Sequence, residues 1–137
     1  MDIHASLAKF GLTPCKEDCE NVREILRGEI EKEREGLRRS PDLALLCCVQ
    51  LFAAASPEDI DLIWSAKTSG WDLGAYLDGR LVLVLGLEET KRYLSNRKTD
   101  ESAKALDYIE AMEVTGQLAG FSRENTIGDY RRYFHLA

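Results

Sequence analysis

The sequence predicts an all-α protein in which residues 1–137 form a single compact domain of about six or seven helices. Apolar residues recur at the three- and four-residue spacing of helices, and two Ser-Pro-acid triplets mark helix starts. A length of 137 residues with 45% hydrophobic and 31% charged residues is typical of one globular domain. Only residues 74–85 allow an alternative, a small β-hairpin.

The first long helix is expected between residues 14 and 39, with Thr13 as its N-cap and Pro14 at its first position. Most other residues of this segment are charged, and acids stand three or four residues before bases, which is the favoured order on a helix. We therefore expect an amphipathic helix on the outside of the domain. Its buried stripe would consist of Val22, Ile25, Leu26, Ile30 and Leu37.

Two further helix starts combine a hydroxyl residue at the N-cap, proline at the first position and acids in the first turn. Ser40-Pro41-Asp42 opens the stretch from residue 43 to residue 55, which is apolar on nearly every side and is expected to be the central helix. Ser56 and Pro57 open a second helix that ends near residue 70. Trp64 lies on the apolar stripe of that helix and is expected in the core.

Residues 74–85 allow two structures. Asp78-Gly79 between two apolar runs fits the two-residue turn of a β-hairpin. The run from Leu81 to Leu85 does not alternate and is rich in leucine, which favours a buried helix with Asp78 as its cap and Gly86 as its end. We favour the helix, because the neighbouring segments are helical.

The last third of the chain predicts three more helical segments. Residues 87–94 place acids first and bases last, and Thr99 caps a helix that ends at Gly116. The terminal segment carries Tyr130, Tyr133 and Phe134 at helical spacing. We expect these aromatics to dock the last turn on the body of the domain.

Charge and hydropathy exclude several kinds of partner. The 24 acidic residues outnumber the 18 basic ones, and the net charge of -6 has the wrong sign for binding a nucleic-acid backbone. The longest apolar stretch, residues 43–55, is shorter than the ~20 residues that a membrane-spanning helix needs. The first residues contain no basic stretch followed by an apolar one, so we expect a cytoplasmic protein without nucleic-acid or membrane partners.

No metal site or cofactor is expected. Cys15 and Cys19 have a spacing that can begin a zinc site, but His4 and His135 are the only histidines and lie at opposite ends of the chain. The same scarcity of histidine argues against a catalytic triad, and phosphate-loop and metalloprotease motifs are absent. We therefore expect a protein that is not an enzyme.

One catalytic alternative stays open at the level of the sequence. Asp72, Asp78 and Glu88 lie in one irregular segment, and two carboxylates can act as general acid and base across a cleft. Each of these acids also has a plain structural explanation as a turn, cap or first-turn residue.

The candidate partner-binding residues are Trp71, Asp72, Tyr76 and Asp78. Tryptophan and tyrosine are frequent at protein interfaces, and acidic neighbours would recognise a partner with a basic surface. The alternative is that both aromatic side chains belong to the core, because aromatics supply much of the buried area of small domains.

The stretches Asp61–Thr68 and Leu85–Leu94 resemble segments of small bacterial proteins that carry no mechanistic motif. In size, acidity and lack of a catalytic signature, the chain is also similar to immunity proteins of bacterial toxin systems. That resemblance implies a small cytoplasmic domain that binds and blocks a cognate toxin, and it transfers no functional residue to this sequence.

We therefore expect a non-catalytic protein-binding inhibitor, most concretely an immunity protein whose partner is a toxin with a basic surface. The alternative is an adaptor or regulatory subunit of a bacterial complex that dimerises through the charged helix from Glu20 to Arg39. The sequence leaves the oligomeric state open.

Overall fold

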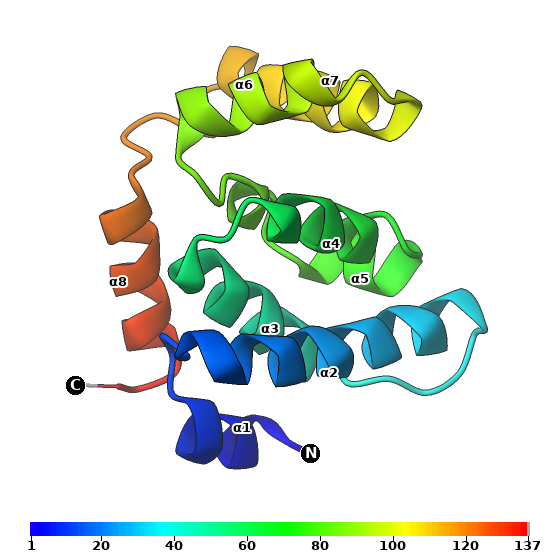
Figure 1. The fold of residues 1–137 in the computed structure, drawn as a ribbon, viewed down its shortest axis with the longest axis vertical. Coiled ribbons are helices and arrows are strands. Elements are labelled where there is room, and N and C mark those ends of the chain that lie inside the picture. Colours follow the sequence, from blue (N-terminus) through cyan, green and yellow to red (C-terminus); the bar gives the residue numbers. More distant parts are fainter. Residues whose placement is uncertain (137) are drawn as a thin grey trace.

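The computed structural model describes residues 1–136 and contains eight α-helices, one 3₁₀-helix and no strand in that part of the chain (Figure 1). The all-α prediction is thus confirmed. Two short helices, α1 and α5, were not expected. The elements in order are α1 (Ile3–Phe10), α2 (Lys16–Arg34), α3 (Pro41–Ala54), α4 (Glu58–Lys67), α5 (Trp71–Tyr76), η1 (Gly79–Val82), α6 (Leu87–Arg97), α7 (Asp100–Val114) and α8 (Arg123–Tyr133).

Helix α3 is the centre of the fold, as predicted. Ser40 is its N-cap, Pro41 is its first residue, and every residue from Leu43 to Phe52 is buried. A helix that is apolar on all sides must be covered on all sides. The helices α1, α2, α4, α5 and α8 all contact α3 (Figure 1).

Helix α2 is shorter than expected at both ends. The chain is still extended at Cys15, with ψ of 168°, so the predicted Thr13 cap is wrong and the helix begins at Lys16. Cys15 is therefore the N-cap, and Pro14 precedes the helix instead of occupying its first position. At the other end, Gly36 has φ of +70° and closes the helix. Leu37 therefore leaves the apolar stripe and is 52% exposed.

Residues 74–76 belong to α5, and residues 77–85 form neither the hairpin nor a regular α-helix. Asp78 caps a single 3₁₀ turn by accepting a hydrogen bond from the Arg80 amide at 2.9 Å. Leu81, Val82, Leu83 and Val84 are all completely buried. A strand there would need a partner strand for its backbone groups, whereas successive tight turns satisfy them locally. Gly86, predicted to end a helix here, instead has φ of +87° and is the N-cap of α6.

Helices α6 and α7 pack against each other and form a separate layer at the top of Figure 1. Thr99 caps α7 through reciprocal hydrogen bonds with Ser102. Trp64 of α4 joins this layer to the body, because its indole N–H donates to Glu101 at 3.1 Å and its ring lies 5.5 Å from that of Tyr108. Trp64 is buried, as expected.

Helix α8 runs along the left side of Figure 1 and docks on α3. The Arg123 guanidinium donates to the carbonyls of Phe52 at 2.8 Å and Val84 at 2.7 Å, and lies 4.6 Å from the centre of the Phe52 ring. The predicted docking of the aromatic tail holds for Tyr130, which is buried, and for Phe134, which is partly buried against the core. It does not hold for Tyr133, which contacts both rings but is exposed. None of the described helices is both long and apolar enough to span a membrane.

Candidate functional site

The structure places three of the four candidate partner-binding residues on α5. Trp71 is the first residue of this helix and is 88% exposed, while Asp72 and Tyr76 are partly exposed. Leu73 is the one buried residue of α5. The alternative that both aromatic side chains belong to the core is therefore wrong, because a six-residue helix can bury only one narrow face.

Asp78 lies apart from the other three and faces inward. Its carboxylate accepts hydrogen bonds from the Arg80 guanidinium at 2.8 Å and from the Tyr130 hydroxyl at 2.7 Å. Burial acts to raise the pKa of this carboxyl group, but the hydrogen bonds from Arg80 and Tyr130 outweigh it and hold the pKa below its ordinary value. Asp78 thus joins the end of α5 to α8.

A buried carboxylate holds the N-terminal end of α5. Glu33 of α2 accepts a hydrogen bond from the Leu73 amide at 2.8 Å and forms an ion pair with Arg39 at 2.6 Å. The backbone at Gly70 approaches so closely that a Cβ atom there would lie 2.7 Å from the Glu33 carboxyl carbon. A carboxylate is well placed near the first amides of a helix, which carry partial positive charge.

A partly buried lysine holds the C-terminal end of the same helix. Lys67 of α4 donates to the carbonyl of Leu77 at 2.6 Å and to the carbonyl of Gly74. Burial lowers the pKa of Lys67, and the nearby Asp78 carboxylate partly offsets this effect. Glu33 and Lys67 together satisfy backbone groups at both ends of a helix that is too short to be stable alone.

The exposed surface continues from α5 onto two neighbouring elements. The Tyr76 hydroxyl lies 3.4 Å from the hydroxyl of Tyr133, and this hydrogen bond together with burial raises the pKa of Tyr76 to about 12. On the other side, Leu37 and Asp72 line a shared hollow of about 310 Å³. We call Leu37, Trp71, Tyr76 and Tyr133, which are four of the six exposed large apolar residues, the α5 surface.

The acids of the predicted site are largely neutralised within the chain. Asp72 forms an ion pair with Arg39, and Asp78 is paired with Arg80. Neither acid therefore offers a free negative charge to a basic partner at the α5 surface. The hollow at Asp72 is lined by neither Asp78 nor Glu88, so it does not bring together the carboxylates of the catalytic alternative.

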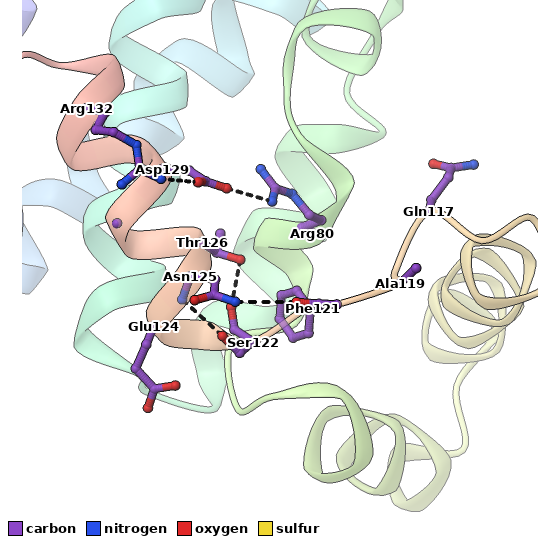
Figure 2. A pocket seen from close by; sticks show the side chains of 12 residues that line it. Arg80, Gln117, Ala119, Phe121, Ser122, Glu124, Asn125, Thr126, Asp129 and Arg132 are labelled. Atoms are coloured by element: carbon purple, nitrogen blue, oxygen red, sulfur yellow. Dashed lines mark hydrogen bonds and ion pairs between the residues drawn. The ribbon is translucent and has the colours of Figure 1, made fainter.

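A second hollow, of about 390 Å³, lies at the start of α8 (Figure 2). Figure 2 shows Asp129 between Arg80 and Arg132, with its carboxylate 3.2 Å and 2.6 Å from the two guanidinium groups. Ser122 accepts a hydrogen bond from the Asn125 amide as the helix cap. These polar groups bind one another, so we assign the hollow a structural role.

Sequence reasoning missed the two residues that hold α5. Glu33 was counted with the solvated charges of α2, although the positions Val22, Leu26, Ile30 and Glu33 follow one helical stripe and are all buried. Lys67 stands just past the apolar stripe of α4, where a lysine is equally typical of a surface position. Its partners come from a helix that the sequence did not predict.

Within the described part of the chain, no three His, Cys, Asp or Glu side chains gather in a way that could hold a metal ion. All four cysteines are free, and only Cys15 is exposed. Comparison with known protein families, curated proteins and solved structures finds no match.

Proposed function

We propose that this chain is a protein-binding inhibitor, most concretely an immunity protein that binds a cognate bacterial toxin through the α5 surface. The observation that carries the proposal is the 88% exposure of Trp71 on a helix held at both ends by Glu33 and Lys67. Exposing a tryptophan to water is costly, and tryptophan is enriched among the residues that dominate binding energy.

The way α5 is held also favours binding. A side chain presented by a fixed helix loses little conformational freedom when a partner covers it, so more of the contact energy appears as affinity. Exposed apolar patches of a few hundred Å² on small proteins often mark an interaction site. The α5 surface includes one large exposed indole, the Tyr76–Tyr133 pair, and Leu37, which shares a hollow with Asp72.

The net charge supports a partner with a basic surface. The chain carries -6 overall, and α7 alone contributes five acids and one lysine. A field of this sign attracts a basic protein over distances of about a Debye length, which is ~8 Å at physiological salt. The attraction raises the association rate more than it raises the final affinity.

The adaptor alternative receives less support from the geometry. A helix that forms a stable homodimer presents exposed apolar residues to its partner, whereas none of the exposed large apolar residues lies within α2. The outer face of α2 instead carries ion pairs such as those of Arg27 with Glu20 and Glu24. We therefore place the interface on α5 and not on α2.

The test is affinity purification from a lysate of the source organism, followed by a growth assay. The baits are the wild-type chain, Trp71→Ala and the control Val114→Ala, since Val114 is also 88% exposed but lies at the end of α7. We expect a partner that binds wild type and Val114→Ala, but binds Trp71→Ala at least about 30-fold more weakly, the size of a hot-spot loss.

The captured partner should also stop growth when expressed alone, and co-expression of this chain should restore growth. Equal capture by the Trp71→Ala variant would show that the α5 surface is not the interface. Recovery of a non-toxic assembly of several subunits would favour the adaptor function.

A further inference from the structure

The hollow beside Trp71 shows which chemistry the α5 surface is suited to bind. It is an open depression of about 310 Å³, and its lining consists of Gly36, Leu37, Arg38, Arg39, Pro41 and Asp72, the residue that follows Trp71 in the chain. Leu37 is 52% exposed and supplies its apolar wall. The charged side chains of the lining are Arg38, Arg39 and Asp72.

The charges in this hollow do not cancel. Arg39 is fully engaged, because it pairs with Glu33 and Asp72 and donates to the Leu37 carbonyl at 2.7 Å. Arg38 is exposed, and among the described residues no acid lies within 4.0 Å of its guanidinium. One uncompensated positive charge therefore lines the hollow together with an exposed leucine, and Asp72 of the same lining directly follows the exposed Trp71 in the chain. The protein as a whole carries a negative net charge.

We propose that the surface formed by Leu37, Arg38 and Trp71 binds a partner segment in which a carboxylate stands next to a large apolar side chain. The guanidinium of Arg38 would take the carboxylate with two parallel hydrogen bonds, a geometry that arginine favours. Leu37 and Trp71 would cover the apolar neighbour. This inference rests on the proposed function and specifies the chemistry of the partner at the contact.

A basic side chain is a poor occupant of the same hollow. It would meet the like charge of Arg38, and the one acid of the lining, Asp72, already pairs with Arg39. Close like charges cost binding energy and exclude wrong partners. The overall charge of -6 and the local charge of Arg38 act at different ranges, so a basic protein can be attracted as a whole and still contribute an acid at the contact.

Peptide phage display tests the inference without knowledge of the partner. Random peptides are selected on the wild-type chain and counter-selected on Trp71→Ala, so that only peptides that depend on Trp71 are kept. We expect the enriched sequences to share Asp or Glu next to Leu, Phe or Trp. A synthetic peptide of that consensus is then measured by isothermal titration calorimetry.

The matched variants are Arg38→Glu and Lys16→Glu, which make the same charge change at two exposed positions without an ion partner. We expect Arg38→Glu to weaken the peptide about tenfold and Lys16→Glu to change its affinity less than twofold, with unchanged melting curves. A consensus rich in Lys or Arg, or an Arg38→Glu variant that binds as tightly as wild type, would overturn the inference. The absence of any enriched peptide that depends on Trp71 would also overturn the inference, whereas the proposed function is decided separately by the capture assay with Trp71→Ala.

Discussion

Replacing Lys67 with methionine tests whether the ends of α5 are held as described. Methionine keeps an unbranched side chain of similar length but removes the ammonium group that donates to the carbonyls of Gly74 and Leu77. Helix α5 has six residues and Leu73 is its one buried residue, so the hydrogen bonds at its ends contribute much of its resistance to opening. We expect α5 to open more often while the rest of the fold stays intact.

The size of this effect follows from the two lost hydrogen bonds. A hydrogen bond from a charged donor contributes about 1.5–3 kcal/mol, and burying methionine in place of an ammonium group recovers part of that. We expect a net loss of about 2 kcal/mol in the free energy of opening α5. This corresponds to a roughly 30-fold rise in the population of the open helix.

Native-state hydrogen exchange measures this opening directly. The amides of Gly74 and Leu77 donate to Gly70 and Leu73 within α5, at 3.0 Å and 2.9 Å, and they should exchange about 30-fold faster in the variant. Amides of α3 should be affected much less. The control is Lys104→Met on α7, because Lys104 is an exposed lysine paired with Glu101. Unchanged exchange at Gly74 and Leu77 in Lys67→Met would refute the reasoning.

Three further predictions concern stability and accessibility. Gly79→Ala would place a Cβ atom 2.3 Å from the Tyr108 hydroxyl, so we expect a loss of about 1–3 kcal/mol in urea unfolding, and an unchanged midpoint would contradict this close approach. Because the pKa of Asp78 is lowered from 3.8 in the folded protein, its stabilising effect is complete above that value and is lost as the pH falls through the folded pKa. The stability difference between wild type and Asp78→Asn should therefore shrink from pH 6 to pH 3, and a constant difference would argue against an ionised Asp78. Ellman's reagent should titrate one thiol, Cys15, in the native protein and four in urea, since the other cysteines are buried; more than one native thiol would show that the core opens easily.

Local signals in the sequence predicted the starts of α3 and α7 correctly, although both ends of α2 were predicted wrongly. The Ser40-Pro41 start of α3 and the Thr99 start of α7 depend on residues within one turn, so one short window of sequence contains the whole signal. No short stretch of sequence predicts helix α5, because the side chains that bind its two ends, Glu33 and Lys67, belong to α2 and α4. Glu33 stands 40 positions before Leu73, and no periodicity connects them.

The candidate site was predicted only in part, because some of its contacts also join residues far apart in the sequence. Residue type alone placed Trp71, Asp72 and Tyr76 on a shared segment, and the structure puts them on one helix. Asp78 turned inward because Tyr130, 52 positions later, donates a hydrogen bond to it. The uncompensated charge of Arg38 was equally invisible in the sequence, because the neutralisation of Arg39 and Asp72 depends on the approach of α2 to α5.

The two tryptophans stand in opposite environments, and this gives the protein two optical signals that can be separated. Trp64 is buried against Tyr108 and bound to Glu101, so its fluorescence should lie at shorter wavelength and resist quenching by acrylamide. Trp71 is almost fully in water, so its emission should lie at longer wavelength and be quenched readily. Covering of the α5 surface by a partner would then appear as a loss of quenching at long wavelength alone, whereas detachment of the α6–α7 layer would appear as a red shift of Trp64. Intrinsic tryptophan fluorescence of a single unlabelled sample can thus distinguish partner binding from unfolding.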